Sequence, residues 1–497
     1  MEGELWFASI WIAFIVPLVW YVITNKGRVG ARRLPPGPRP LPIVGNLLDL
    51  RGGNLHENLA SLAHAYGAVM TLEIGLVTTI VVSSRDAARD AFTRHDRRLA
   101  ARTVPDTRRA LAHADRSMVW LPSSDPLWKS LRGVAATHVF SPRGLSGASV
   151  HRARERMVRG VVDFFRRRTG QEVEVGHVLQ DGVFDLLTNV LFSIDAGDEL
   201  RELMDEIVAV LAKPNLSDFF PLIRQFDVQG IRRWSTMRMT GVLHILDDII
   251  DSRLAATAGG QQKNDDVLDS LLALVSTGKL TRRDVGAMLF DILAAGTETT
   301  KITVEWVLAE LLHNPSVMAA ARAEMKAVLG ANQQGTAITD ADVAKLPYLQ
   351  AVVKESMRLH PVAPLLLPHQ VVEDGVEIGG YAVPKGATVI FNSWAIMRDA
   401  AAWERPDEFL PERFLGKTEL DMWGKEHKFI PLGTGRRLCP ALPMVELIVP
   451  FTVASLLHEF EWRLPKGMSA EQVDVTEKYM SNDTLVMAVP LKLVPAT

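Results

Sequence analysis

One cysteine, Cys439, stands out in this 497-residue chain because its neighbours favour metal-binding or nucleophilic chemistry. It lies in the segment FIPLGTGRRLCPALP, which leads into an apolar stretch. Gly433 and Gly435 allow the backbone to turn closely around the sulfur, and Arg436 and Arg437 favour thiolate over thiol. The start of a predicted helix adds a dipole that favours an anion. The pattern therefore predicts a thiolate, either a nucleophile or a metal ligand.

The cysteine count narrows the choice between these chemistries. A lone cysteine often packs as a small apolar side chain, but the charged, glycine-rich surroundings argue against that reading here. One sulfur cannot by itself make a zinc site. It can serve as the single axial ligand of haem iron, because the porphyrin supplies the other four bonds.

The loop resembles the cysteine-ligand loop of the cytochrome P450 family, F-x-x-G-x-R-x-C-x-G. Two positions depart from that pattern: Leu432 replaces the phenylalanine, and Ala441 replaces the last glycine. Neither change removes a ligand, although Leu432 can shift the redox potential of the iron. Four further motifs follow the order and spacing of the family, namely Trp128–Arg132, the AGTETT segment at 295–300, Glu355–Arg358 and Pro411–Phe414.

The resemblance covers nearly the whole chain and implies a haem-thiolate monooxygenase. Its fold would be mainly α with small β-sheets, preceded by a single transmembrane helix. Haem b would be the cofactor, with Cys439 as the iron ligand. We expect an N-terminal transmembrane anchor at 1–25, a basic and proline-rich tether at 26–43 and a haem-binding catalytic domain at 44–497.

The segment 284–312 is predicted to be one long apolar helix. Thr299 follows Ala295 by four residues, so both share a face. In the family, small Ala295 and Gly296 would leave room for dioxygen, Thr299 would offer a hydroxyl, and Glu298 would relay protons. Taken without the cysteine loop, the segment could equally be an amphipathic core helix.

Other residues take expected roles from the resemblance. The haem propionates would be held by Trp128, Arg132, His369 and Arg437. A buried ion network would serve stability and haem assembly, and its members are Glu355, Arg358 and Arg413.

The expected substrate pocket is apolar, with Asp291 as the exception. Its expected members are Phe220, Phe290, Asp291, Ala295, Val362, Leu366 and Asn482. Such a lining suits an apolar olefin better than an acid or a sugar. The segments PPGP at 35–38 and NLSDFFP at 215–221 resemble the plant geraniol-hydroxylase-like family, whose grass members hydroxylate labdane-related diterpenes in phytoalexin formation. A diterpene olefin is therefore the preferred substrate, with a monoterpenoid as the alternative.

The N-terminus predicts a membrane anchor. Leu5–Ile23 is uncharged and would span roughly 28 Å as a helix. Acidic residues precede it and basic residues follow it, which places the catalytic domain in the cytosol at the endoplasmic reticulum. A cleaved signal peptide would need the opposite flanks. With this topology, neither Asn215 nor Asn482 would be glycosylated.

The partners follow from the same reasoning. No flavin or nicotinamide fingerprint is present in the sequence, so electrons from NADPH must come through a separate reductase, with cytochrome b5 as a further candidate. Lys129, Lys425, His427, Lys428 and Arg436 are the candidate docking residues. The net charge of −3 gives no reason to expect nucleic-acid binding. A haem-thiolate isomerase or dehydratase, or a non-catalytic haem protein, remain alternatives, but neither needs the Glu298–Thr299 pair.

Overall fold

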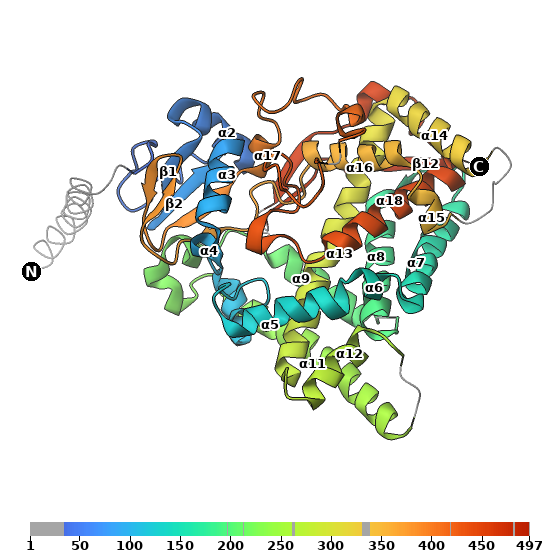
Figure 1. The fold of residues 1–497 in the computed structure, drawn as a ribbon, viewed down its shortest axis with the longest axis horizontal. Coiled ribbons are helices and arrows are strands. Elements are labelled where there is room, and N and C mark those ends of the chain that lie inside the picture. The colour runs from blue at the N-terminus through green and yellow to red at the C-terminus, as the bar shows by residue number, and fades with distance from the viewer. Residues whose placement is uncertain are drawn as a thin grey trace, which may run out of the picture.

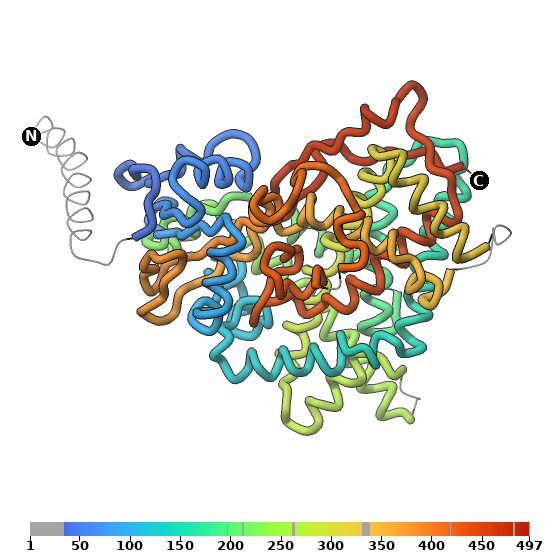
Figure 2. Tube along the Cα trace, turned by 45° about the horizontal axis from the view of Figure 1, so that its top comes forward, coloured from blue at the N-terminus to red at the C-terminus, as the bar shows by residue number. Residues whose placement is uncertain are grey.

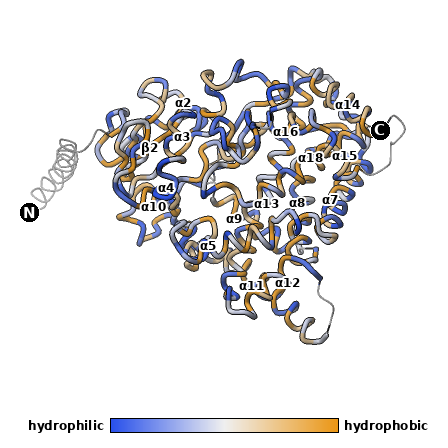
Figure 3. Tube along the Cα trace, in the orientation of Figure 1, coloured by the Kyte–Doolittle hydropathy of each residue, from blue (hydrophilic) through white to orange (hydrophobic). Residues whose placement is uncertain are grey.

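The computed structural model describes residues 34–496 except 196, 212, 261–263, 331–337, 418, 481 and 482. The predicted anchor, the first part of the tether and Asn482 lie outside these residues. Helices fill most of the body, and a smaller sheet region lies beside the N-terminal part (Figure 1). Apolar and polar positions alternate along most of the helices, as expected for helices with one buried face (Figure 3).

The long central helix is α13, Arg282–His313. A capping box starts it: the Thr281 hydroxyl accepts from the Asp284 amide, and the Asp284 carboxylate accepts from the Thr281 amide. The helix packs against α8 (Val175–Phe192), α16 (Pro347–Leu359) and α18 (Leu442–Glu459). The predicted helix over 284–312 is therefore confirmed.

The apolar pattern of residues 341–359 predicts one helix, but the structure has two, because Pro347 separates α15 (Asp340–Val343) from α16. Among the described residues, α18 is the one helix long and apolar enough to span a membrane, but most of it is buried as a core helix.

The largest sheet joins distant parts of the chain. Its strands are β1 (Val69–Ile74), β2 (Val77–Val82), β8 (Thr388–Phe391), β5 (His369–Gln370) and β3 (Ala101–Arg102), in that order. The alternating pattern of residues 70–83 around Gly75 predicts a strand pair, and β1 and β2 form it as a hairpin; β8 pairs in parallel with β2. Blue N-terminal strands consequently lie beside orange C-terminal ones in Figure 2, which brings Arg102 opposite His369.

The described part of the tether packs onto this sheet. The Thr71 amide donates to the Pro36 carbonyl at 2.8 Å, and the Thr71 hydroxyl donates to the Pro35 carbonyl at 2.9 Å. A Cβ atom at Gly37 would lie 1.9 Å from the Thr71 carbonyl oxygen. Glycine at this position therefore permits the close approach between the proline-rich segment and β1.

Candidate haem and substrate site

Cys439 lies immediately before α18, as predicted from the sequence. Its amide donates to the Leu432 carbonyl at 3.0 Å, which closes the loop. Gly433 and Gly435 have φ angles of 77° and 66°, a region that favours glycine. A Cβ atom at Gly435 would also lie 2.6 Å from the Asp96 carboxylate. The loop geometry thus requires glycine at these two positions.

The charges around the sulfur differ from the expectation. Arg436 is exposed and pairs with Asp96 at 3.5 Å, while Arg437 turns toward backbone carbonyls. Burial raises the pKa of the Cys439 thiol, and the Ala441 amide and the Arg132 charge oppose this effect. The two loop arginines were therefore wrongly assigned as the cause of thiolate formation. Arg132, from α5 (Pro126–Val134), is the cation that acts on the sulfur.

Four basic side chains gather beside the cysteine loop: Arg102, Arg132, His369 and Arg437. Burial, together with the charges of Arg437 and Arg132, lowers the pKa of Arg102 to about 9. The Nε atom of Arg102 is buried without a hydrogen-bond partner among the described residues. Burial and the charges of Arg102 and Arg437 also lower the pKa of His369 well below its ordinary value. The cluster therefore has an excess of buried positive charge.

The other expected propionate partners make backbone contacts. Arg132 donates to the Leu438 carbonyl at 2.9 Å, and Arg437 donates to the Ala100 carbonyl at 2.9 Å. Trp128 donates its indole N–H to the Met118 carbonyl at 3.1 Å. Trp128 thus positions a loop, and this bond uses its single side-chain N–H donor. The centroid of its ring lies 4.9 Å from the Arg437 guanidinium carbon.

This arrangement fits haem. Two buried propionates would neutralise the clustered cations and give Arg102 Nε an acceptor. The single thiol lies next to the cluster and could supply the one protein ligand that haem iron requires. Arg102 was not predicted as a propionate partner. The signal that identifies it is the pairing of β3 with β5, which the sequence alone does not reveal.

Ala295 and Gly296, the two small residues of α13 that were expected to leave room for dioxygen, have surroundings that differ from each other. Ala295 is exposed although it lies in the middle of a core helix, so it faces an open space. Gly296 points elsewhere: a Cβ atom there would lie 2.9 Å from a Leu187 methyl group on α8. Its small size therefore serves the packing of two helices rather than the room expected for dioxygen. The Thr299 hydroxyl donates to the Ala295 carbonyl at 2.6 Å, which leaves its oxygen lone pairs as acceptors.

Asp291 is not a free charge in an apolar pocket. His113 Nε2 lies 2.8 Å from one carboxylate oxygen, and the Ser117 hydroxyl donates to the other at 2.7 Å. All three side chains are buried. Phe290 contacts the His113 ring edge-on, with centroids 4.9 Å apart. Among these partners, His113 and Ser117 were missed because they lie in a loop without a periodic pattern.

The remaining expected pocket residues are spread over several elements. The Val362 carbonyl accepts from the Leu485 amide at 2.8 Å, near α13. Leu366 is buried with φ of 49°, next to the Leu367 carbonyl that accepts from Arg102. Phe220 is half-buried between α10 (Leu216–Phe219) and the 3₁₀ helix η3 (Pro221–Phe226).

The expected ion network is present as a set of contacts. The fully buried Glu355 carboxylate accepts from Arg358 at 2.7 and 2.9 Å and from Arg413 Nε at 3.0 Å. The Leu410 amide donates to it at 2.9 Å. Arg358 also donates to the Met397 and Pro406 carbonyls. These bonds connect α16 with the chain that leads to the cysteine loop.

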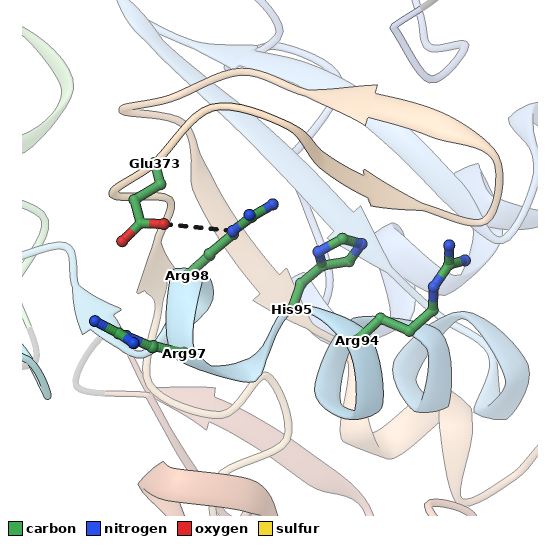
Figure 4. A pocket seen from close by; sticks show the side chains of 5 residues that line it. All are labelled: Arg94, His95, Arg97, Arg98 and Glu373. Atoms are coloured by element: carbon green, nitrogen blue, oxygen red, sulfur yellow. Dashed lines mark ion pairs between the residues drawn. The ribbon is translucent and has the colours of Figure 1, made fainter.

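Basic residues also occupy the surface beside the cysteine loop. A surface pocket of about 360 Å³ is lined by Arg94, His95, Arg97, Arg98 and Glu373 (Figure 4). Its only ion pair in that view joins Arg98 and Glu373 at 3.4 Å. Lys129 and Arg436 are exposed, whereas Lys428 is half-buried with its ammonium 5.3 Å from the Trp403 ring.

Comparison with known proteins agrees with this geometry. The family model for cytochrome P450 matches residues 35–489. Oryzalexin D synthase from Oryza sativa subsp. japonica is 54% identical, and the match covers 99% of each chain. Ent-cassadiene C11-alpha-hydroxylase 1 from the same organism is 53% identical, again over 99% of each chain. Geraniol 8-hydroxylase from Swertia mussotii is 39% identical over 98% of each.

A solved structure of a zebra fish cytochrome P450 with progesterone shows the same fold, with a TM-score of 0.76 and 24% identity. The match covers 90% of this chain and all of that one. The chain belongs to the cytochrome P450 family. The predicted family, the mainly α fold with small sheets and the monooxygenase class are confirmed.

Proposed function

We propose that this monooxygenase hydroxylates a labdane-related diterpene olefin in plant specialised, phytoalexin-forming metabolism. The observation that carries the proposal is full-length identity of 51–54% to rice enzymes named for ent-cassadiene and for oryzalexins D and E. The 39% identity to geraniol 8-hydroxylase keeps a monoterpenoid as the second candidate. An isomerase or a non-catalytic haem protein is disfavoured because both Glu298 and Thr299 are present.

Each part of the site then has a task. Haem, when bound, supplies the activation of dioxygen. Cys439 would provide the thiolate ligand of its iron, and Arg102, Arg132, His369 and Arg437 would hold its propionates. The Thr299 hydroxyl, oriented by the Ala295 carbonyl, would accept a hydrogen bond through its remaining lone pairs. Glu298 would pass protons inward from solvent.

The substrate is tested by co-expression with a plant NADPH–cytochrome P450 reductase. Diterpene and monoterpene olefins are fed in parallel, and products are identified by mass spectrometry. A hydroxylated diterpene is expected, and exclusive oxidation of monoterpenes would overturn the diterpene proposal. Cys439→Ser is the control: it should lose both the thiolate-specific carbon monoxide band and the product.

We also propose that the donor docks on the face that carries the cysteine loop, where the basic pocket of Figure 4 and Lys129 lie. Cytochrome b5 is a candidate for the same face. Opposite charges on the donor would raise the association rate more than the affinity. Arg436 contributes less than expected, because Asp96 partly neutralises it.

The proposed location is the endoplasmic reticulum membrane, with a single N-terminal span and a cytosolic catalytic domain. The charge pattern around Leu5–Ile23 supports it. Protease added to sealed microsomes should digest the domain, and Asn215 should carry no glycan. A protected, glycosylated domain would reverse the topology.

A further inference from the structure

Arg108 has an unusual environment for an arginine. It belongs to the 3₁₀ segment η1 (Asp106–Asp115), which packs against α11 (Ile231–Ala258). Burial lowers the pKa of Arg108 to about 10, and Asp291 opposes this effect. The side chain nevertheless stays partly accessible. A side chain that is deep in the protein and still accessible lines an internal space.

The guanidinium of Arg108 has donors to spare. It lies over the Trp120 ring, whose centroid is 5.7 Å from the guanidinium carbon. Among the described residues, none accepts a hydrogen bond from the Arg108 guanidinium, and no carboxylate oxygen lies within ion-pair distance of it; the backbone amide alone donates, to the Pro105 carbonyl at 3.0 Å. Both oxygens of Asp291 are already occupied by His113 and Ser117. An arginine carries five N–H donors, and burying them unmatched is costly.

Two neighbours, Asp291 and Trp120, connect Arg108 with the haem and substrate site described above. Asp291, the acidic group that acts on it, lies four residues and thus one helical turn before Ala295 on α13. Trp120 lies in the segment whose carbonyls at Met118, Val119 and Leu121 accept from Arg437. Arg108 therefore lies between Asp291 on α13 and the loop segment that receives Arg437.

We propose that Arg108 binds an oxygen atom already present on the substrate, so that the enzyme prefers a diterpenoid alcohol or ketone to the parent hydrocarbon. The inference rests on the proposed function and deepens it. Asp291 decides the type of oxygen group. Its negative charge offsets the arginine, so a neutral acceptor completes the site, whereas a carboxylate would add an unmatched negative charge beside Asp291.

The rival explanation is structural: Arg108 could serve only to stack on Trp120 and to offset Asp291. The two explanations predict different ligand dependence. A structural arginine would affect all ligands alike, because its loss would disturb the loop. A binding arginine would affect only ligands that carry the oxygen atom.

The test is a spectral binding titration with one labdane-related olefin and its monohydroxylated derivative. Haem-loaded wild type, Arg108→Leu and Arg109→Leu are compared. Arg109 is the adjacent, exposed arginine and serves as the matched control. For Arg108→Leu, the Kd of the alcohol should rise roughly tenfold to a hundredfold, the loss expected for a hydrogen bond from a charged donor. The Kd of the olefin should stay unchanged, and Arg109→Leu should match wild type.

Equal weakening of both ligands, or no preference of wild type for the alcohol, would overturn the inference while leaving the diterpene proposal intact. Binding of neither ligand to wild type would overturn both. The carbon monoxide difference band reports whether each variant is folded and loaded. If Arg108→Leu does not load haem, Arg108→Lys keeps the charge without the planar fork. It should still weaken the alcohol selectively, and a wild-type affinity ratio for this variant would contradict the proposal.

Discussion

Glu477 lies at the centre of a buried network that joins four parts of the fold. One carboxylate oxygen accepts from His360 at 2.6 Å and from Arg398 at 3.3 Å. The other accepts from Trp394 at 2.8 Å and from His56 at 3.2 Å. The Glu477 side chain is 7% exposed, so solvent screens these contacts only weakly. We predict that Glu477→Gln destabilises the protein strongly.

The size of the effect follows from the contacts. Glutamine keeps the shape and one acceptor oxygen, so two of the four N–H donors keep a partner. The amide nitrogen faces the other two donors, and each loses a charge-assisted bond worth about 1.5–2 kcal/mol. The predicted loss is therefore about 3–4 kcal/mol, in the range for breaking one side of a buried ion pair.

The pH dependence has a definite sign. Burial alone would raise the pKa of Glu477, but hydrogen bonds from His360 and His56 outweigh it and hold that pKa well below its ordinary 4.5. This contribution is present above pH 4.5 and is lost as pH falls toward the folded value. Burial alone would lower the pKa of His360, but hydrogen bonds to Glu310 and Glu477 outweigh burial and raise that pKa above 6.5. That contribution is complete below pH 6.5 and is lost as pH rises through the folded value.

The assay is urea unfolding followed by tryptophan fluorescence at a series of pH values. The difference between wild type and Glu477→Gln should be largest between pH 4.5 and 6.5 and should shrink on both sides. The control is Glu471→Gln, at an exposed carboxylate, which should unfold with the wild type. A difference below about 1 kcal/mol near pH 6, or one that is independent of pH, would refute the assignment of a charged network.

Three further outcomes follow from the site. Thr299→Ala should lower product formed per NADPH consumed severalfold, because the hydroxyl that would order proton delivery to the site is then missing; unchanged coupling would remove Thr299 from the mechanism. Glu355→Gln should cost about 3–5 kcal/mol and reduce haem loading, measured as carbon monoxide band against total protein, since it leaves two arginines without their carboxylate. Lys129→Glu with Lys428→Glu should slow stopped-flow reduction by the reductase at low salt, with substrate binding unchanged. Equal reduction rates would place docking elsewhere.

Elements with strong local signals could be predicted from the sequence. The helix α13 has a long apolar pattern and a Thr281–Asp284 capping box, and the β1–β2 hairpin alternates around Gly75. The position of Cys439 before α18 also follows from local composition. In each case, neighbours within a few residues determine the conformation, so that the chain itself carries the information.

Contacts between distant segments could not be predicted in the same way. Arg102 faces His369 only because β3 pairs with β5 across more than 260 positions of chain. The direction of Arg437 depends on backbone carbonyls at Ala100 and in residues 118–121, and the latter segment forms neither helix nor strand. Charge counting near the cysteine therefore suggested the wrong arginines, because it takes no account of where a long side chain finds its acceptors.

The loop of residues 106–121 also links the proposed substrate contacts with the proposed propionate contacts. The Asp106 amide donates to the Asp218 carboxylate, Arg232 donates to the Asp106 carboxylate, and His113 contacts Asp291 on α13. These ties hold Leu111 and Ala112 at φ of 52° and 54°, a costly conformation for residues other than glycine. Because residues 118–121 of this loop also receive Arg437, a change that moves the loop would shift the proposed propionate contacts and the proposed Arg108 anchor together. In variants that move this loop, selectivity and haem retention should therefore vary jointly, whereas variants of the Glu355 network should reduce stability and haem retention without altering selectivity.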